Sequence, residues 1–211
     1  MRITTGKYKG RNMLMPKGIR PTQNKVRKAI FDILGDIEGL SFLELYAGSG
    51  AVGFEALSRG IAELTLVEYN RDCQLAIRKN IEMLKAKACN LYPQEADKAI
   101  ERLSKEGKRF DIVFLDPPYY IGNTFKVMPL SGTPGLIGKA GVQISAATPS
   151  LKGKAGVPVS LAKNTLQTLG AYDILAPNGL VILQHFKRDD LPKESGKLAL
   201  IKESRYGDTV L

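Results

Sequence analysis

From residue 41 onward, the chain alternates short apolar runs with amphipathic segments. Short apolar runs bounded by polar residues predict buried strands, and apolar positions that recur every three or four residues predict helices. The expected strands are SFLELYA (41–47), AELTLVE (62–68), FDIVFLD (110–116) and GLVILQHF (179–186), with a weaker one at CNLYPQEA (89–96). The expected helices are 51–59, 71–86, 97–107 and 162–175. This alternation predicts an α/β fold with a mostly parallel sheet and helices on both faces.

The two ends of the chain add smaller elements to this core. Residues 1–35 are expected to form an N-terminal extension of the same domain, with a short β-hairpin around Lys9-Gly10-Arg11 and a helix at about 22–34. At the other end, 198–206 and 208–211 predict two further strands joined tightly through Gly207. The pattern therefore predicts seven strands in all.

Charge divides the chain more sharply than composition does. The formal net charge is +10, yet nine basic residues fall within 1–31 with no acid before Asp32, and five lysines fall within 121–172 with no acid at all. The rest of the chain is acidic overall. A positive excess confined to two segments predicts a polyanion-binding surface, for which a solvated basic surface is the alternative.

The segment at about 122–160 interrupts the alternating pattern. It is rich in Gly and Pro and contains two similar stretches, LIGKAGVQISAA (136–147) and LKGKAGVPVSLA (151–162). A loop of this length inside a compact domain is unusual, and it is either a functional flap or a mobile insertion. Two interpretations stay open, a mobile surface insertion and a clamp on a nucleic acid.

Several classes of protein are disfavoured by what the sequence lacks. No apolar run is long enough for a membrane span and the first residues do not resemble a signal peptide, so we expect a cytoplasmic protein. Cys73 and Cys89 have no histidines at ligand spacing, and His185 is the only histidine. We therefore expect neither a disulfide framework nor a metal site. His185 is expected to be a histidine of the core or of a strand end.

The stretch ELYAGSGAVG contains G-x-G-x-x-G at Gly48, Gly50 and Gly53, between an expected strand and an expected helix. That motif alone suggests a dinucleotide, whose pyrophosphate would lie at the carboxyl edge of the sheet. Glu44 begins the same stretch, and a carboxylate facing this crevice would repel a pyrophosphate. It suits a cationic ligand such as the ammonium and sulfonium of S-adenosylmethionine, while Glu68 after the next strand suits a ribose diol.

The most specific motif is Asp116-Pro117-Pro118-Tyr119, directly after an apolar strand. Consecutive prolines fix φ and remove two backbone donors, which leaves a stiff turn of acceptors. The Asp116 carboxylate and the Pro117 carbonyl can then accept both hydrogens of one exocyclic amino group, which orients its lone pair toward an electrophilic methyl. Tyr119 offers a face for stacking an extruded base. A plain turn that ends the strand is the alternative.

With these residues in view, the chain resembles the class I S-adenosylmethionine-dependent methyltransferases of the D/N-P-P-Y/F type. More narrowly, it resembles the RsmD-like family that methylates N2 of a guanine in 16S ribosomal RNA. The resemblance is carried by GKYKGRNM, PKGIRPTQNKVRKAIFDIL, ELYAGSGAVGFEALSRG, FDIVFLDPPY, LAPNGLVILQH and RYGDTVL, in that order.

The resemblance implies a Rossmann-like, seven-stranded sheet with an antiparallel last strand, in a methyltransferase domain of residues 36–211. It implies catalysis at Asp116, Pro117, Pro118 and Tyr119. The residues implied for S-adenosylmethionine binding are Glu44, Tyr46, Gly48, Gly50, Glu68, Tyr69 and Asp97. Those implied for RNA binding, or for the border of the active site, are Lys7, Lys9, Arg11, Arg20, Thr22 and Arg27. Glu44 and Tyr46 depart from the Asp and Phe more common in the family.

The sequence hypothesis is therefore methyl transfer to a guanine N2 amine in ribosomal RNA or the small ribosomal subunit, by a monomer without a metal. One alternative is a DNA amino-methyltransferase acting on adenine N6 or cytosine N4, which would use the same chemistry. Another is an RNA-binding assembly factor whose catalysis is impaired by the insertion. A nicotinamide-dependent oxidoreductase is a third.

Overall fold

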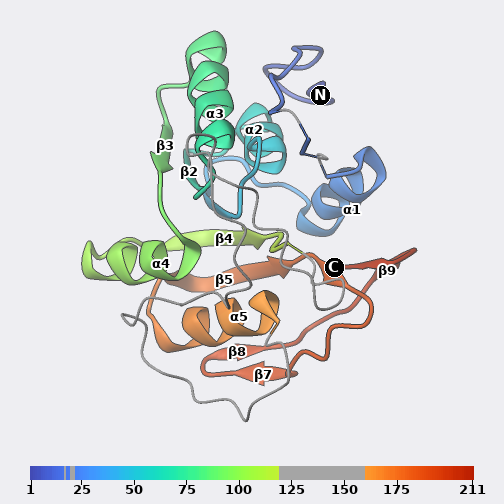
Figure 1. Cartoon of the computed structure of the whole chain (residues 1–211), viewed down its shortest axis with the longest axis vertical. Helices are drawn as coiled ribbons and strands as arrows, with labels where there is room; N and C mark the ends of the chain where they lie inside the picture. The colour runs from blue at the N-terminus through green and yellow to red at the C-terminus, as the bar shows by residue number, and fades with distance from the viewer. Residues whose placement is uncertain (17, 20–21, 119–159) are drawn as a thin grey trace, which may run out of the picture. The chain divides into compact units, whose positions relative to one another are not determined.

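Five parallel strands form the central sheet, in the order β3-β2-β1-β4-β5 (Figure 1). They are β1 (Ser41–Leu45), β2 (Glu63–Val67), β3 (Cys89–Tyr92), β4 (Phe110–Leu115) and β5 (Leu175–Leu183). The computed structural model of the chain describes residues 1–16, 18–19, 22–118 and 160–211. The Gly/Pro-rich segment and nearly all of its repeat lie outside these residues. The parallel sheet predicted from the apolar runs is confirmed.

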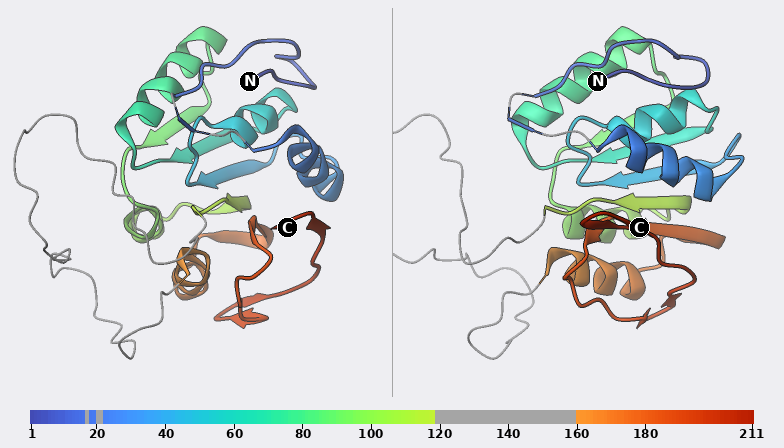
Figure 2. Two further views of the ribbon diagram at one scale, coloured as in Figure 1. Left: turned by 45° about the vertical axis from the view of Figure 1, so that its right-hand side comes forward. Right: turned by 90° about the vertical axis from the view of Figure 1, so that its right-hand side faces the viewer.

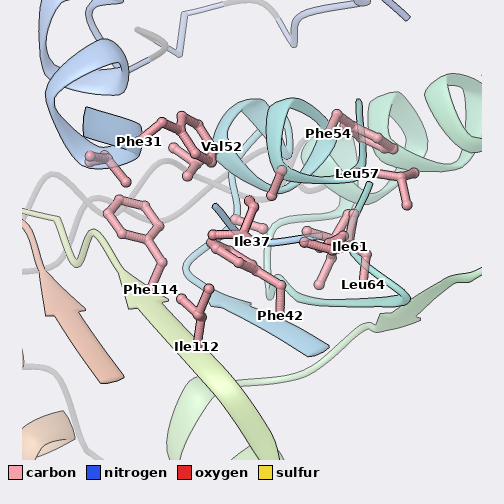
Figure 3. Close-up of a cluster of buried hydrophobic side chains, with 14 of the residues drawn as sticks. Phe31, Ile37, Phe42, Val52, Phe54, Leu57, Ile61, Leu64, Ile112 and Phe114 are labelled. Atoms are coloured by element: carbon pink, nitrogen blue, oxygen red, sulfur yellow. The ribbon is translucent and has the colours of Figure 1, made fainter. Parts of the chain in front are cut away.

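Helices cover both faces of this sheet (Figure 2). One face carries α1 (Asn24–Leu34), α2 (Ala51–Ser58) and α3 (Arg71–Leu84), and the other carries α4 (Ala96–Lys105) and α5 (Leu161–Ala171). Successive strand residues point to opposite faces, so β1 places Phe42 in the first core and Leu43 in the second. Figure 3 shows the first core, where side chains from α1, α2 and the strands converge.

The helix boundaries follow local signals in the sequence. Asn70 caps α3, because its side-chain oxygen accepts hydrogen bonds from the backbone N–H groups of Asp72 (2.9 Å) and Cys73 (3.2 Å). Gly50 precedes α2 in the left-handed conformation, with φ of 74°. The predicted helix at 162–175 ends earlier, at Ala171, since β5 already begins at Leu175. No helix among the described residues combines the length and apolar character needed to cross a bilayer.

The N-terminal extension packs onto the same face as α2. Instead of a full hairpin around Gly10, the chain makes a single antiparallel bridge between Arg2 and Asn12. Thr4 donates from its backbone N–H (2.9 Å) and its hydroxyl (2.6 Å) to the buried carboxylate of Glu55 on α2. The extension is therefore attached to the core by polar contacts with α2.

The prediction of one seven-stranded sheet is wrong. Instead, β6 (His185–Phe186), β10 (Thr209–Val210) and β9 (Arg205–Tyr206) form a small antiparallel sheet, and β7 (Glu194–Ser195) pairs with β8 (Leu198–Ala199). The expected strand at 198–206 is interrupted between β8 and β9, where Leu200 and Ile201 are exposed. The turn through Gly207 and the antiparallel pairing of the last strand are present in shortened form.

Candidate active site

A cavity of about 860 Å³ lies at the carboxyl edge of the sheet. β1 and β4 are neighbours in the sheet, although β2, β3 and the three helices α2, α3 and α4 separate them in the chain. Open α/β sheets bind ligands at such a switch point. Ten of the predicted site residues line the cavity: Thr22, Glu44, Tyr46, Gly48, Glu68, Tyr69, Asp97, Asp116, Pro117 and Pro118.

Two of the three motif glycines of ELYAGSGAVG, Gly50 and Gly53, are needed because neighbouring side chains leave no room for a Cβ. A Cβ on Gly50 would lie 2.7 Å from the Phe54 ring, and Gly50 also has a positive φ. A Cβ on Gly53 would lie 2.6 Å from Oε2 of Glu44. Only Gly48, with φ of 56° and its nearest side-chain atom 3.9 Å away, presents an open backbone to the cavity. Gly50 lies beside the cavity and does not line it.

Glu44 lies at the bottom of the cavity and is almost fully buried. Its Oε2 accepts the backbone N–H of Gly53 at 2.8 Å, and Val52 also donates to it. Burial raises the pKa of this carboxyl to about 8, and the backbone hydrogen bonds oppose the shift only in part. Nearby Asp116 and Glu68 raise its pKa further. A cation entering the cavity would favour its ionised form.

Glu68 follows β2 and is held by backbone donors. Its Oε2 accepts the N–H of Gly48 and its Oε1 accepts the N–H of Asn70, both at 2.7 Å. Burial raises the pKa of Glu68, and these backbone hydrogen bonds oppose the rise. Both carboxylate oxygens are thus fixed in direction, with lone pairs left for a ligand.

Asp116 and Pro117 form a rigid corner at the end of β4. The register pairs Leu45 with Leu115, so the residue after each of these strands reaches the same edge of the sheet. Burial raises the pKa of Asp116 to about 7, and a hydrogen bond from the Thr22 side chain opposes the rise. Pro117 is buried, whereas Pro118 is exposed. Tyr119 lies outside the described residues.

Three further predicted residues differ in how firmly they are held. Tyr46 has a positive φ of 59°, and its hydroxyl lies 2.6 Å from Oγ1 of Thr165 on α5. Asp97 lies in the first turn of α4, where burial raises the pKa of its carboxyl and the Thr168 side chain opposes the rise. Tyr69 is 70% exposed at the cavity rim.

The charge of the cavity is of one sign. Five carboxylates line it, from Glu44, Glu68, Glu95, Asp97 and Asp116, and no lysine or arginine is found among the described lining residues. A pyrophosphate at this position would face carboxylates without a compensating cation. The cavity therefore suits a cationic or neutral ligand.

Sequence reasoning missed several lining residues. Gln94 and Glu95 precede α4, Asn70 precedes α3, and Gln184 follows β5 directly. Gln184 is only 7% exposed. A polar residue at the carboxyl end of an apolar strand, as in GLVILQHF, was the available signal for Gln184.

The basic N-terminal residues that were predicted to bind RNA do not share one environment. Lys7, Lys9 and Arg11 are exposed, and the backbone N–H of Lys7 donates to Ser58 at the far end of α2, about 12 Å of helix away from the glycine loop. Arg20 lies outside the described residues.

The prediction that Arg27 contacts RNA is wrong for this conformation. Its side chain is 1% exposed and lies 3.6 Å from the buried Glu55 carboxylate. Its guanidinium also donates to the carbonyl of Arg2 and to Oδ1 of Asn24. A buried carboxylate needs compensating charge, and Glu55 on α2 has two cations 3.6 Å away, Arg27 and Arg59.

The remaining titratable residues named from the sequence do not line the cavity. Cys73 and Cys89 are free thiols, and burial raises the pKa of each to about 12, so neither is a reactive thiolate. His185 lies at a strand end, with Nδ1 3.0 Å from the carbonyl oxygen of Phe186. Its position agrees with the structural role predicted for it.

The sequence is similar to those of ribosomal RNA methyltransferases from two bacteria. The chain is 28% identical over 213 residues to the "Putative rRNA methyltransferase YlbH" of Bacillus subtilis, covering 99% of this chain and 95% of that protein. It is 38% identical over 125 residues to the "Ribosomal RNA small subunit methyltransferase D" of Escherichia coli, covering 58% of this chain and 62% of that protein.

A solved structure shows the same fold. The "Putative methyltransferase yhhF from Escherichia coli" superposes with a TM-score of 0.72 at 27% identity, covering all of this chain and 94% of that one. The fold is therefore an α/β methyltransferase fold. The model of the family described as "Conserved hypothetical protein 95" matches residues 1–145. The chain belongs to this family, in agreement with the RsmD-like resemblance of its sequence.

Proposed function

We propose that this protein transfers a methyl group from S-adenosylmethionine to the N2 amine of a guanine in small-subunit ribosomal RNA. The observation that carries the proposal is that Glu44 and the Asp116-Pro117 corner line the same cavity. The charged residues among its described lining are all acidic. A positively charged alkyl donor and a nucleobase amine are the two partners that such a cavity suits. The named relatives are ribosomal RNA methyltransferases, which supports the choice of RNA.

The residues present fit this cofactor. S-adenosylmethionine carries an ammonium, a sulfonium, a ribose diol and an adenine. Glu44 offers a buried negative charge for the cationic part, and Glu68 offers oriented acceptors for the diol. Asp97 at the start of α4 is assigned to the adenine amine, and Tyr46, Gly48 and Tyr69 complete the proposed binding wall. When bound, the cofactor supplies an electrophilic methyl group on a positively charged sulfur.

The protein's own contribution to catalysis is orientation. The Asp116 carboxylate and the Pro117 carbonyl accept the two N–H bonds of the base amine, so its lone pair is held in one direction. The oriented amine would take up the methyl group that the bound cofactor would supply, and the methylated nitrogen would then release a proton. We assign the acceptance of that proton to the Asp116 carboxylate. Tyr119, outside the described residues, is assigned to base stacking from its motif.

The phosphate backbone of the RNA is proposed to bind outside the acidic cavity that takes the target base. Lys7, Lys9 and Arg11 are exposed on the N-terminal extension and have no ion-pair partner among the described residues. Basic side chains in this state contact phosphates without first breaking a salt bridge. Thr22, later in the N-terminal segment, lines the cavity, and Arg20 is assigned to RNA binding from its sequence alone.

A direct experiment tests the reaction and its target together. Undermethylated small ribosomal subunits and free 16S RNA are incubated with the protein and isotopically labelled S-adenosylmethionine, and the nucleosides are separated. Label in N2-methylguanosine supports the proposal. Label only in a DNA substrate at adenine N6 or cytosine N4 identifies the DNA alternative, and cofactor binding without any transfer identifies an RNA-binding scaffold.

A further inference from the structure

Gln184 directly follows β5 and lies beside Asp116 at the edge of the sheet. The register pairs Leu115 of β4 with Leu183 of β5, and the backbone N–H of Gln184 donates to the carbonyl of Leu115 at 2.8 Å. Since neighbouring strands lie about 4.8 Å apart, the two residues that follow this pair, Asp116 and Gln184, start from adjacent backbone positions. Both residues line the cavity.

Two sheets fix the position of Gln184. It is the single residue between β5 of the central sheet and β6 of the small antiparallel sheet. β6 pairs with β10, whose residue Thr209 also lines the cavity. Gln184 is only 7% exposed. Its carboxamide is therefore presented to a ligand in the cavity and not to bulk solvent, from a backbone that is held on both sides.

The order of the strands places Gln184 on the side of Asp116 opposite to the proposed cofactor wall. The acids of that wall come from β1, from the end of β2 and from the helix that follows β3: Glu44, Glu68 and Asp97. In the sheet, β4 lies next to β1, and β5 lies on the far side of β4. A base whose amine is held at Asp116, with the methyl donor toward β1, extends its ring into the space that is left, toward the end of β5. Gln184 lies at that end.

A carboxamide is complementary to the guanine atoms next to the target amine. It carries an oxygen acceptor and an NH₂ donor side by side. Read outward from the N2 amine, the Watson–Crick edge of guanine presents the N1–H donor and then the O6 acceptor. The oxygen of Gln184 can accept N1–H while its NH₂ donates to O6, with Asp116 and Pro117 holding the amine. Enzymes that extrude a base read its Watson–Crick edge by hydrogen bonds of this kind.

The other bases that carry an exocyclic amine do not offer the same order of groups. Adenine has an unprotonated N1 beside its amine and a C–H beyond it, and cytosine has an unprotonated N3 and then the O2 acceptor. A carboxamide can therefore make one hydrogen bond to either edge but not two. Ionised carboxylates, which supply every charge among the described lining residues, have no donor for O6. A neutral amide beside Asp116 thus favours guanine.

We propose that Gln184 is a specificity-determining residue that recognises guanine, by pairing its carboxamide with N1–H and O6 of the base whose amine Asp116 and Pro117 hold. The inference rests on the proposed function, because that function assigns the Asp116-Pro117 corner to the amine. It goes further by naming the side chain that selects guanine over adenine and cytosine.

A substitution in the RNA, combined with one in the protein, tests this role. 2-Aminopurine keeps the N2 amine of guanine but has neither N1–H nor O6, and it replaces the target guanine in the RNA mapped by the labelling experiment above. Gln184→Met keeps the length of the side chain and removes both hydrogen-bonding groups. In this variant we expect kcat/KM on the guanine RNA to fall about 10²-fold, because two polar groups of the base lose their partners. On the 2-aminopurine RNA, which lacks those groups, kcat/KM should change by no more than about threefold.

Two further variants sharpen the result. Gln184→Glu keeps the acceptor for N1–H and loses the donor to O6, so its kcat/KM on guanine RNA should lie between those of the wild type and Gln184→Met. Gln167→Met changes an exposed glutamine of α5 that does not line the cavity, and it should behave like the wild type. Kd for S-adenosylmethionine should be unchanged in all three. If Gln184→Met loses cofactor affinity, the same comparison of the two RNAs in Gln184→Glu, which has the original side-chain shape, decides the question.

Equal losses on the two RNAs would overturn the inference, because a side chain with only a structural role does not distinguish guanine from 2-aminopurine. The proposed function would then still stand, since the wild type methylates guanine. If the wild type methylates no guanine N2, the proposed function fails and the inference fails with it. The wild-type reaction on guanine RNA thus separates the two failures.

Discussion

The two sides of the cavity hold their carboxylates by different means. Glu44 and Glu68 accept backbone N–H groups, from Gly53 and Val52 in the first case and from Gly48 and Asn70 in the second. For Asp116 no backbone donor opposes the rise of its pKa, and the Thr22 side chain does so instead. Backbone donors cannot be lost by a side-chain substitution, whereas a hydroxyl can. The proposed cofactor wall is therefore set by the course of the chain, and the proposed catalytic corner depends on a residue that one substitution removes.

The largest effect should come from the catalytic corner. Asp116→Ala is expected to lower kcat by about 10³-fold, because an oriented acceptor at the reacting amine is lost, while Kd for S-adenosylmethionine changes by no more than about twofold. Single-turnover methyl transfer and calorimetry measure the two quantities.

The control for this substitution lies on the same strand. Asp111 is five residues earlier on β4 and accepts from the backbone N–H (2.8 Å) and the hydroxyl (2.7 Å) of Ser41, away from the cavity lining. Asp111→Ala should retain kcat. Equal losses in both variants would mean that the effect is one of folding and not of chemistry.

The next largest effect concerns the tight contact beneath the proposed cofactor wall. Gly53→Ala would place a Cβ 2.6 Å from Oε2 of Glu44 and 2.8 Å from side-chain atoms of Leu64 and Leu66. Although Ala normally stabilises a helix relative to Gly, overpacking here should lower the free energy of unfolding by about 1–3 kcal/mol. Urea denaturation measures it.

A double-mutant cycle identifies the source of that strain. In a Glu44→Ala background the carboxylate is gone, so Gly53→Ala should cost less than in the wild type. Additive losses would show that Glu44 is not what excludes a side chain at position 53.

Glu68 tests whether the backbone-held wall binds the cofactor. Glu68→Gln keeps the size of the side chain but puts an NH₂ against a backbone N–H donor, of either Gly48 or Asn70. We expect Kd for S-adenosylmethionine to rise about tenfold to a hundredfold by calorimetry. Glu63→Gln, at the other end of β2 and paired with Lys108 at 3.1 Å, is the matched control and should bind normally. Unchanged affinity in Glu68→Gln would remove this residue from the proposed site.

The smallest expected effect is a pH dependence of cofactor affinity. The pKa of Glu44 is about 8 in the ligand-free protein, and a cation stabilises the ionised form, so binding must lower that pKa. Affinity is then weaker at pH 6.5, where Glu44 is mostly protonated, and rises toward pH 8.5, by about threefold to tenfold. S-adenosylhomocysteine, which lacks the sulfonium charge, should show a smaller rise. A flat profile for both ligands would contradict the role of Glu44.

Much of this site could be predicted from the sequence, because its elements depend on local pattern. Apolar runs located β1, β2 and β4, and the residues that follow parallel strands must meet at one edge of the sheet. Glu44, Glu68 and Asp116 were therefore placed together without a structure. Their roles as ligands of cofactor and base stay predictions.

Long-range pairing explains what the sequence did not predict. Arg27 looked like one more basic residue in a basic segment, and its partner Glu55 is 28 positions away. The only available signal was Glu55 itself, an acid in the small, apolar and fully buried helix AVGFEALS. Likewise, the pattern of 198–206 predicted one strand, but β8 ends at Ala199 and the apolar side chains of Leu200 and Ile201 are exposed.

The Arg27–Glu55 pair also limits how this protein can be engineered. A chimera that joins residues 1–35 to the rest of a relative inherits Arg27 from one parent and position 55 from the other. If position 55 is apolar, a guanidinium is buried without its carboxylate, which costs about 3–5 kcal/mol. Since that is a large fraction of the stability of a typical domain, grafts between relatives should exchange both positions together.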